Sequence, residues 1–269
     1  EASLLSDGAL VALSSIWALW ALLQLPAVWF RRLRWVVVAF LAVNLVVAAW
    51  QRLAGARGMG VMGVDRFLGT TGALWLPVCW AWHPALAVLP AALLLLAAKP
   101  LPLLAAPWAL AWSLRGRPQL IALSVAVASV AWLGSVDKWP MRVSQRLLTW
   151  WHAFQSTGAH PWVGWGAGPM VWSELRERYG YLLPSMHSDW LVLAVSFGWG
   201  VTAWAAWCWW SVISAAPQTR WARACQAGLL AVGLLAAVQG TVSHARIAAP
   251  AVVLLAWWAA EQREAGGKA

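Results

Sequence analysis

Charged side chains are scarce in this sequence, since Asp, Glu, Lys and Arg make up only 10% of its 269 residues. Hydrophobic residues account for 62%, and this balance excludes a soluble domain with a single membrane anchor. The composition predicts instead an all-α, polytopic integral membrane helical bundle, with residues 1–269 forming a single membrane domain.

Acidic residues and cysteines are especially few. The nine Asp and Glu residues form no cluster suited to a divalent cation, so we expect no metal site and no cofactor. The three cysteines lie in or beside apolar runs and include no C-x-x-C pair, so we expect neither a disulfide nor a cysteine-bound metal. They are Cys79, Cys208 and Cys225.

Tryptophan, by contrast, is abundant, with 26 residues. Indole rings favour the level of the lipid headgroups, where the apolar ring and the single N–H donor are both satisfied. The net charge of +10 would indicate nucleic acid for a soluble protein. In a membrane protein it indicates anionic lipid or phosphate, and we expect no nucleic-acid partner.

The apolar runs predict about nine transmembrane helices. They lie near residues 8–30, 35–50, 69–82, 85–98, 101–114, 118–136, 188–213, 224–241 and 246–261. This count places a turn at His83-Pro84. The alternative is one span over 69–98, kinked at its prolines, which would reverse the orientation of everything before it.

The charges predict a topology that contains one contradiction. With nine spans and the tail inside, nine cations face the cytoplasm, on the segments Arg31–Arg34, Arg115–Arg117 and Arg220–Arg223 and on the tail. The outer side then carries ten, eight of them Arg, although outer loops should be poor in basic residues. One explanation is that the topology is wrong or that these arginines pair with nearby acids. The other is that they form a guanidinium cluster that binds phosphate.

The polar stretch 137–187 interrupts the apolar segments and is predicted to be one long extracytoplasmic loop that carries the functional site. It contains Arg146, then the turn HPWVGWGAG over 160–168, and ends on His187, with Gly198 eleven positions later. In this order and spacing the block resembles the signature of the O-antigen ligase and polymerase superfamily. The RFLGTTG segment over 66–72 is similar to an earlier element of that family. Ser188 departs from the pattern, because the family usually has Asn there.

The resemblance implies a multi-pass enzyme of the bacterial inner membrane that transfers a glycan from a polyprenyl (undecaprenyl) diphosphate donor. The acceptor would be a hydroxyl of a glycan, lipid or protein on the outer face. Arg66 and Arg146 would hold the diphosphate, with Arg142 or Arg176 beside them. His187 would take the acceptor's proton, the configuration would invert, and no metal would be needed.

Local chemistry allows these roles and also simpler ones. Gly164 and Gly166 permit positive φ and close approach of backbone amides to a ligand, but a loop corner needs glycine as well. His187 lies at the membrane boundary, where an ionisable group is a functional candidate, although a histidine bonded to a backbone carbonyl is the usual alternative. His244, in a short outer loop, is a second candidate for substrate binding.

The competing class is a non-enzymatic transporter or flippase-like protein for anionic isoprenoid lipids. Such a protein should have ionisable residues deep in its spans or two related halves. The sequence has neither Arg nor Lys deep in an apolar run and no internal repeat, so we favour the enzyme.

Overall fold

The computed structural model describes residues 19–55, 65–97, 100–114, 119–120, 122–125, 127–128, 139–166, 188–238 and 245–267. For residues 65–67, 100, 139–145 and 245–247 it describes the backbone alone. The regular structure in these ranges is entirely helical, without a strand, which confirms the predicted all-α class.

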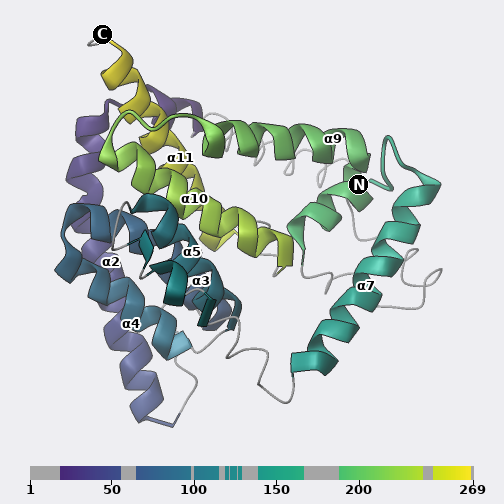
Figure 1. Ribbon diagram of the computed structural model, residues 1–269, viewed down its shortest axis with the longest axis horizontal. Coiled ribbons are helices and arrows are strands. Elements are labelled where there is room, and N and C mark those ends of the chain that lie inside the picture. Colours follow the sequence, from purple (N-terminus) through teal and green to yellow (C-terminus); the bar gives the residue numbers. More distant parts are fainter. Residues whose placement is uncertain are drawn as a thin grey trace, which may run out of the picture.

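A short helical stretch over 19–24 precedes nine named helices. In chain order these are α2 (Ala27–Leu53), α3 (Asp65–Trp82), the short 3-10 helix η2 (Pro84–Ala87), α4 (Val88–Ala97), α5 (Pro100–Ser113), α7 (Trp139–Ala159), α9 (Asp189–Ser214), α10 (Arg220–Val238) and α11 (Ala245–Gly266). In Figure 1, α2 to α5, α10 and α11 gather into one bundle, α7 stands apart on the other side, and α9 runs across the top of the view toward α7.

Three of the described helices, α2, α9 and α10, are long and apolar enough to cross a membrane. Two shorter apolar stretches, Pro84–Ala97 and Leu101–Ser113, accompany them. Large apolar side chains also face outward, among them Val46 and Trp204, which are 69% and 65% exposed. Apolar helices with an apolar exterior indicate a membrane protein.

The chain breaks at Leu25-Pro26 and not at Arg31–Arg34, where the sequence analysis ended one span and began the next. Pro26 has an extended backbone, with φ −70° and ψ 154°, and α2 begins directly after it. Proline has no N–H to donate and disfavours a helical residue before it, so it suits a helix start. The prediction was wrong because arginine is a good helix former, and Arg31 lies inside α2 once its charge is paired.

The predicted turn at His83-Pro84 is present. His83 has an extended backbone, with φ −155° and ψ 128°, and its Nδ1 accepts a hydrogen bond of 3.3 Å from the Ala85 N–H. The helices on either side then pack closely, since a Cβ on Gly72 would lie 2.7 Å from the Pro90 carbonyl oxygen. The stretch 69–98 is therefore an antiparallel hairpin and not one kinked span.

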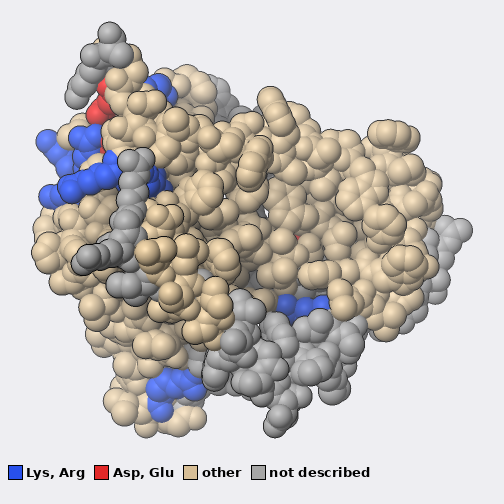
Figure 2. Space-filling model, viewed as in Figure 1, with Lys and Arg blue, Asp and Glu red and all other residues tan. Residues whose placement is uncertain are grey.

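One end of the bundle, called the basic end here, collects the arginines of α2, α10 and α11. Arg263 of α11 donates to the Leu25 carbonyl at 3.3 Å, and the rings of Trp221 in α10 and Trp257 in α11 stack 5.3 Å apart. Figure 2 shows most of the blue side chains of this face near the carboxyl end of the chain. The basic end consists of Arg31, Arg32, Arg34, Arg220, Arg223 and Arg263.

The opposite end, called the far end, holds the ends of α2, α4 and α10 and the starts of α3 and α5. Arg52 in the last turn of α2 donates to the Leu96 carbonyl of α4 at 2.8 Å. Near the start of α3, a Cβ on Gly69 would lie 3.0 Å from the Pro102 Cγ of α5. Helix α3 ends beside the first half of α2, where α10 begins, so α3 and α10 run antiparallel and Val238 lies at the far end.

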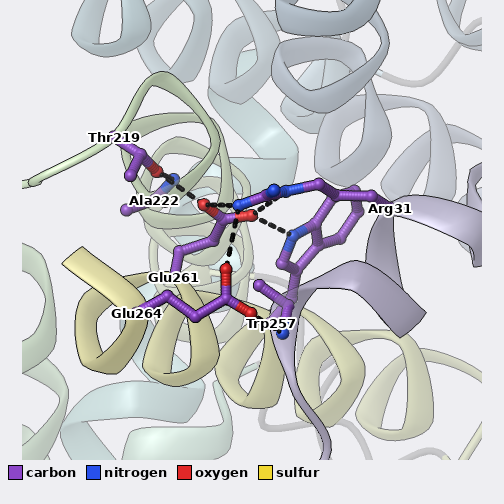
Figure 3. A network of polar contacts seen from close by, with 7 residues as sticks. Arg31, Thr219, Ala222, Trp257, Glu261 and Glu264 are labelled. Carbon is purple, nitrogen blue, oxygen red and sulfur yellow. Dashed lines mark hydrogen bonds and ion pairs between the residues drawn. The ribbon is translucent and has the colours of Figure 1, made fainter. Parts of the chain in front are cut away.

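A buried carboxylate joins three helices at the basic end (Figure 3). Glu261 of α11 is 0% exposed and accepts hydrogen bonds from Arg31 Nε at 2.8 Å and from Thr219 Oγ1 at 2.9 Å. The Trp257 Nε1–H donates to the same carboxylate at 3.1 Å, and Glu264 accepts from the Ala27 N–H at 2.7 Å. A buried charge is tolerated when it is paired and hydrogen-bonded in this way.

Candidate functional site

Arg146 lies well inside α7, seven positions after its first residue. Its Nη1 donates a 2.8 Å hydrogen bond to the carbonyl of Val238, the last residue of α10. Carbonyls in the last turn of a helix lack partners within the helix, and a cation there is favoured by the helix dipole. This bond ties α7 to the far end of the bundle.

A groove of about 540 Å³ lies beside this bond, between α7, the start of α9 and the end of α10. Leu147, the neighbour of Arg146, is on its α7 side, and Ser188 is on its α9 side. The structure therefore brings Leu147, the residue after Arg146, and the first residues of α9 to one groove. The lining consists of Leu147, Trp150, Trp151, Phe154, Ser188, Trp190, Leu191 and Ala237.

His187 directly precedes Ser188 in the chain and lies outside the described residues. Ser188 itself is 3% exposed and caps α9, since its side chain accepts a hydrogen bond from the Leu191 N–H at 3.3 Å. Asp189 occupies the first turn of α9, where a carboxylate is favoured by the helix dipole. The residue that departs from the family pattern is thus the helix cap.

The other predicted arginines are described in part or not at all. Helix α3 begins at the far end, so the backbone of Arg66 shares that end with the Arg146–Val238 bond, while its side chain lies outside the description. Arg142 precedes Arg146 by four residues on α7, with only its backbone described. Arg176 and His244 lie outside the described residues.

Gly164 and Gly166 both have positive φ, 66° and 88°, as the sequence analysis expected of a turn. The amides around them donate within the protein and not into open space. The Gly164 N–H donates to the His160 carbonyl at 2.9 Å, the Trp165 N–H to Val195 at 2.7 Å and the Gly166 N–H to Ser196 at 2.9 Å. The two glycines therefore join the turn to α9 through backbone contacts.

Two features were missed by sequence reasoning. The first is the aromatic wall of the groove, although the Trp150-Trp151 pair in a polar stretch was a visible signal. The second is a break in α9 at Gly198, whose φ of 82° and ψ of 171° are not helical. Glycine followed two residues later by a second glycine, in an otherwise apolar run, was the signal for it.

A second, apolar cavity of about 470 Å³ lies between α9, α10 and α11, inside the bend of α9. Asp189 is the one charged residue among its lining residues. Within the described part of the chain, no three His, Cys, Asp or Glu residues come together as they would to hold a metal ion.

Comparison of the chain with protein-family models, with curated proteins and with solved structures finds no match. The family resemblance therefore rests on the ordered motif residues themselves, and the geometry around Arg146, Ser188 and the glycine turn is the basis for a functional proposal.

Proposed function

We propose that the protein is an integral membrane glycosyltransferase of the O-antigen ligase and polymerase type. It transfers a glycan from a polyprenyl (undecaprenyl) diphosphate donor to an acceptor hydroxyl on the periplasmic face of a bacterial inner membrane. The basic end faces the cytoplasm, the far end faces outward, and residues 137–187 lie on the outer side. The alternating directions of the described helices support this nine-span topology.

One observation carries the proposal. Leu147, the residue after Arg146, lines one groove together with Ser188, the residue after His187, and with Ala237 near the end of α10. Arg146 itself donates to the carbonyl of Val238, the residue after Ala237. Helix α3, with Arg66 as its second residue, begins at the same end.

In the proposed reaction the acceptor oxygen attacks the anomeric carbon, and the bond from that carbon to the diphosphate oxygen breaks. His187 takes the proton of the acceptor hydroxyl, and the electron pair of the broken bond leaves with polyprenyl diphosphate. The guanidinium groups of Arg146 and Arg66, with Arg142 and Arg176, stabilise the growing negative charge, so the reaction is independent of metal and inverts configuration. His244 contributes to acceptor binding.

The test uses the purified protein in nanodiscs with an undecaprenyl-diphosphate-linked glycan and a panel of glycan, lipid and peptide acceptors. We expect transfer by the wild type. His187→Ala should retain donor binding and lose ~10²–10⁴-fold in rate, the usual contribution of a general base. His83→Ala, a histidine at the turn of the α3–α4 hairpin, is the matched control and should keep full activity.

The same preparation in sealed liposomes separates the enzyme from the transporter. Movement of the labelled donor between leaflets without transfer to any acceptor would support the transporter and contradict the glycosyltransferase. A gene deletion that leaves surface glycans and lipid-linked intermediates unchanged would contradict both.

A further inference from the structure

We propose that the turn 160–166 is a backbone clasp that holds α9 broken at Gly198, and that Gly164 and Gly198 are the residues that allow it. The clasp sets the first segment of α9, residues 189–197, against α7. This inference deepens the proposed function and rests on it, because the residues so positioned are those of the proposed transfer site.

The hydrogen bonds of the break carry the first step. In a continuous helix the Trp199 N–H would donate to the Val195 carbonyl. Here the Trp199 N–H donates to the Pro161 carbonyl at 2.8 Å, and the Val195 carbonyl accepts from the Trp165 N–H at 2.7 Å. One bond within the helix is thus replaced by two bonds to the turn.

The Ser196 carbonyl is satisfied in the same way, by the Gly166 N–H at 2.9 Å. An unpaired backbone group in a buried site is destabilising, and more so where water is excluded. The break in α9 would leave such groups unpaired without the turn. The bent form of α9 and the docked turn therefore stabilise each other.

Both glycines are required by space as well as by backbone angle. A Cβ on Gly164 would lie 2.5 Å from the Phe197 nitrogen, and a Cβ on Gly198 would lie 2.8 Å from the Pro161 oxygen and still closer to the Trp162 carbonyl. Backbone atoms have no rotamer by which to move aside. In addition, the φ of 82° and ψ of 171° at Gly198 fall in a region that is essentially restricted to glycine.

The turn is anchored to α7 on its other side. The Trp165 indole N–H donates to the Ser156 carbonyl of α7 at 2.8 Å, and the His160 ring packs edge-on to the Trp165 ring at 4.5 Å. Phe154 of α7 also contacts the Trp199 ring, at 5.8 Å. The clasp therefore links α7, which carries Arg146, to the segment of α9 that begins at Ser188.

The consequence for the proposed site is geometric. If the clasp opens, α9 can recover its continuous hydrogen bonds and straighten, and its first segment then swings away from α7. The groove between Leu147 and Ser188 would widen, and Arg146 would lose its fixed relation to the start of α9. A displacement of about 1 Å between reacting groups costs ~10²-fold in rate.

The experiment measures the bend directly. Spin labels are placed at Val192→Cys and Trp207→Cys, on either side of Gly198, in full-length protein whose partly exposed Cys208 is replaced by Ser. In a straight helix 15 residues span about 22 Å, and the bent form should give a shorter separation. Gly164→Ala and Gly198→Ala should each lengthen the label separation. The double variant should lengthen it little further than either single variant, because both substitutions open the same clasp.

Two other glycines serve as matched controls. A Cβ on Gly158 of α7, or on Gly200 just beyond the break, would meet nothing within 4 Å. Gly158→Ala and Gly200→Ala should therefore leave the label separation and the transfer rate unchanged. In the glycan-transfer assay Gly164→Ala and Gly198→Ala should lower kcat ~10²-fold while donor affinity changes little.

If the alanine variants do not fold, Trp165→Phe gives the answer in a milder form. It keeps an aromatic ring, although a smaller one, and removes the bond to the Ser156 carbonyl. It should lengthen the label separation while leaving the thermal midpoint nearly unchanged. An unchanged separation in every folded clasp variant would overturn the clasp. Lengthened separations in the clasp variants, combined with a wild-type protein that shows no transfer, would uphold the clasp and reject the proposed function.

Discussion

Arg146 has a structural counterpart in Arg52. Each guanidinium donates a 2.8 Å hydrogen bond to a carbonyl near the end of another helix at the far end of the bundle, Arg146 to Val238 and Arg52 to Leu96. The two arginines differ in surroundings, because Arg146 adjoins the groove and the first residues of α9. Substituting each arginine in turn can therefore distinguish a structural role from a role in phosphate binding.

Arg146→Lys should lower glycan transfer about 10- to 100-fold. The ammonium of lysine cannot bind a diphosphate with two parallel hydrogen bonds as the planar guanidinium does. The hydrogen bond lost in this way is worth roughly 1.5–3 kcal/mol when it involves a charged group. Arg52→Lys should retain transfer. Both variants lose a similar bond to a helix end, so their thermal midpoints should fall alike. Equal transfer rates in the two variants would remove Arg146 from the proposed site.

The buried Glu261 supports a second prediction at the residue scale. Arg31→Ala leaves this carboxylate, which is 0% exposed, without its ion pair. We expect a loss of stability of about 3 kcal/mol, near the lower bound for breaking a buried pair because Arg31 is itself partly exposed. Arg32→Ala, which removes an exposed arginine packed over Trp29, should change little.

Thermal unfolding in detergent measures both arginine variants. The double variant Arg31→Ala, Glu261→Gln should recover part of the loss, since it removes the unpaired charge. A double variant less stable than Arg31→Ala alone would show that the remaining bonds to Thr219 and Trp257 need the charge.

Residue-scale prediction from sequence succeeded where the backbone requires one residue type. Positive φ was expected at Gly164 and Gly166 and is present, because such angles need glycine. The carbonyls that accept hydrogen bonds from the amides of this turn were not predictable. Which carbonyls they meet depends on a break in α9 that lies more than 30 residues further along the chain. The roles of Arg66, His187 and the other site residues stay predictions.

At the scale of elements, α10 packs through glycines. A Cβ on Gly228 would lie 2.6 Å from the Leu74 carbonyl of α3, and one on Gly233 would overlap the Trp209 ring of α9. Small residues at these positions let backbones approach, which is how helices associate in membranes, where apolar contact alone does not favour protein over lipid.

Gly228→Ala should therefore lower the stability of the bundle by about 1–3 kcal/mol, the usual cost of overpacking. The obstacle is a backbone carbonyl that does not rotate away. Gly266→Ala, at the exposed end of α11 with open space around it, is the control. Thermal midpoints of the two variants give the comparison, and an unchanged midpoint for Gly228→Ala would contradict the close α3–α10 contact.

Element boundaries were predictable where apolar runs are bounded by proline or by a polar turn. The hairpin at His83-Pro84 and the helix from Asp189 to Ser214 follow the predicted segments closely. The failure at Arg31–Arg34 has a specific cause, since the acid that pairs with Arg31 is 230 residues away in sequence. Helix α7 lies inside the predicted loop, and the span predicted over 118–136 lies largely outside the described residues.

For the whole molecule, three of the described helices are long and apolar enough to cross a membrane, and the count of nine spans stays a prediction. The starts of α2 and α10 and the end of α11 meet at the basic end, and the ends of α2 and α4 meet at the far end. The excess of basic residues assigned to the outer side concerns residues that are mostly not described. Arg52 and Arg146, which are described, each donate to a carbonyl near the end of a helix.

The final prediction concerns which end faces the cytoplasm. Single cysteines are introduced at Ala54 of the far end, at Gly158 in the predicted outer loop and at Gln218 of the basic end, in protein whose Cys208 is replaced by Ser. All three positions are exposed. Thr157, although adjacent to Gly158, is unsuitable because it is 1% exposed.

We expect an impermeant maleimide to label Ala54→Cys and Gly158→Cys in intact spheroplasts and to label Gln218→Cys only after lysis. The physical reason is the positive-inside rule, because the arginines of α2, α10 and α11 meet at one end and such clusters are retained in the cytoplasm. The reverse pattern would place Arg146 and the groove inside. That result would rule out transfer on the outer face, whatever the activity of the purified protein.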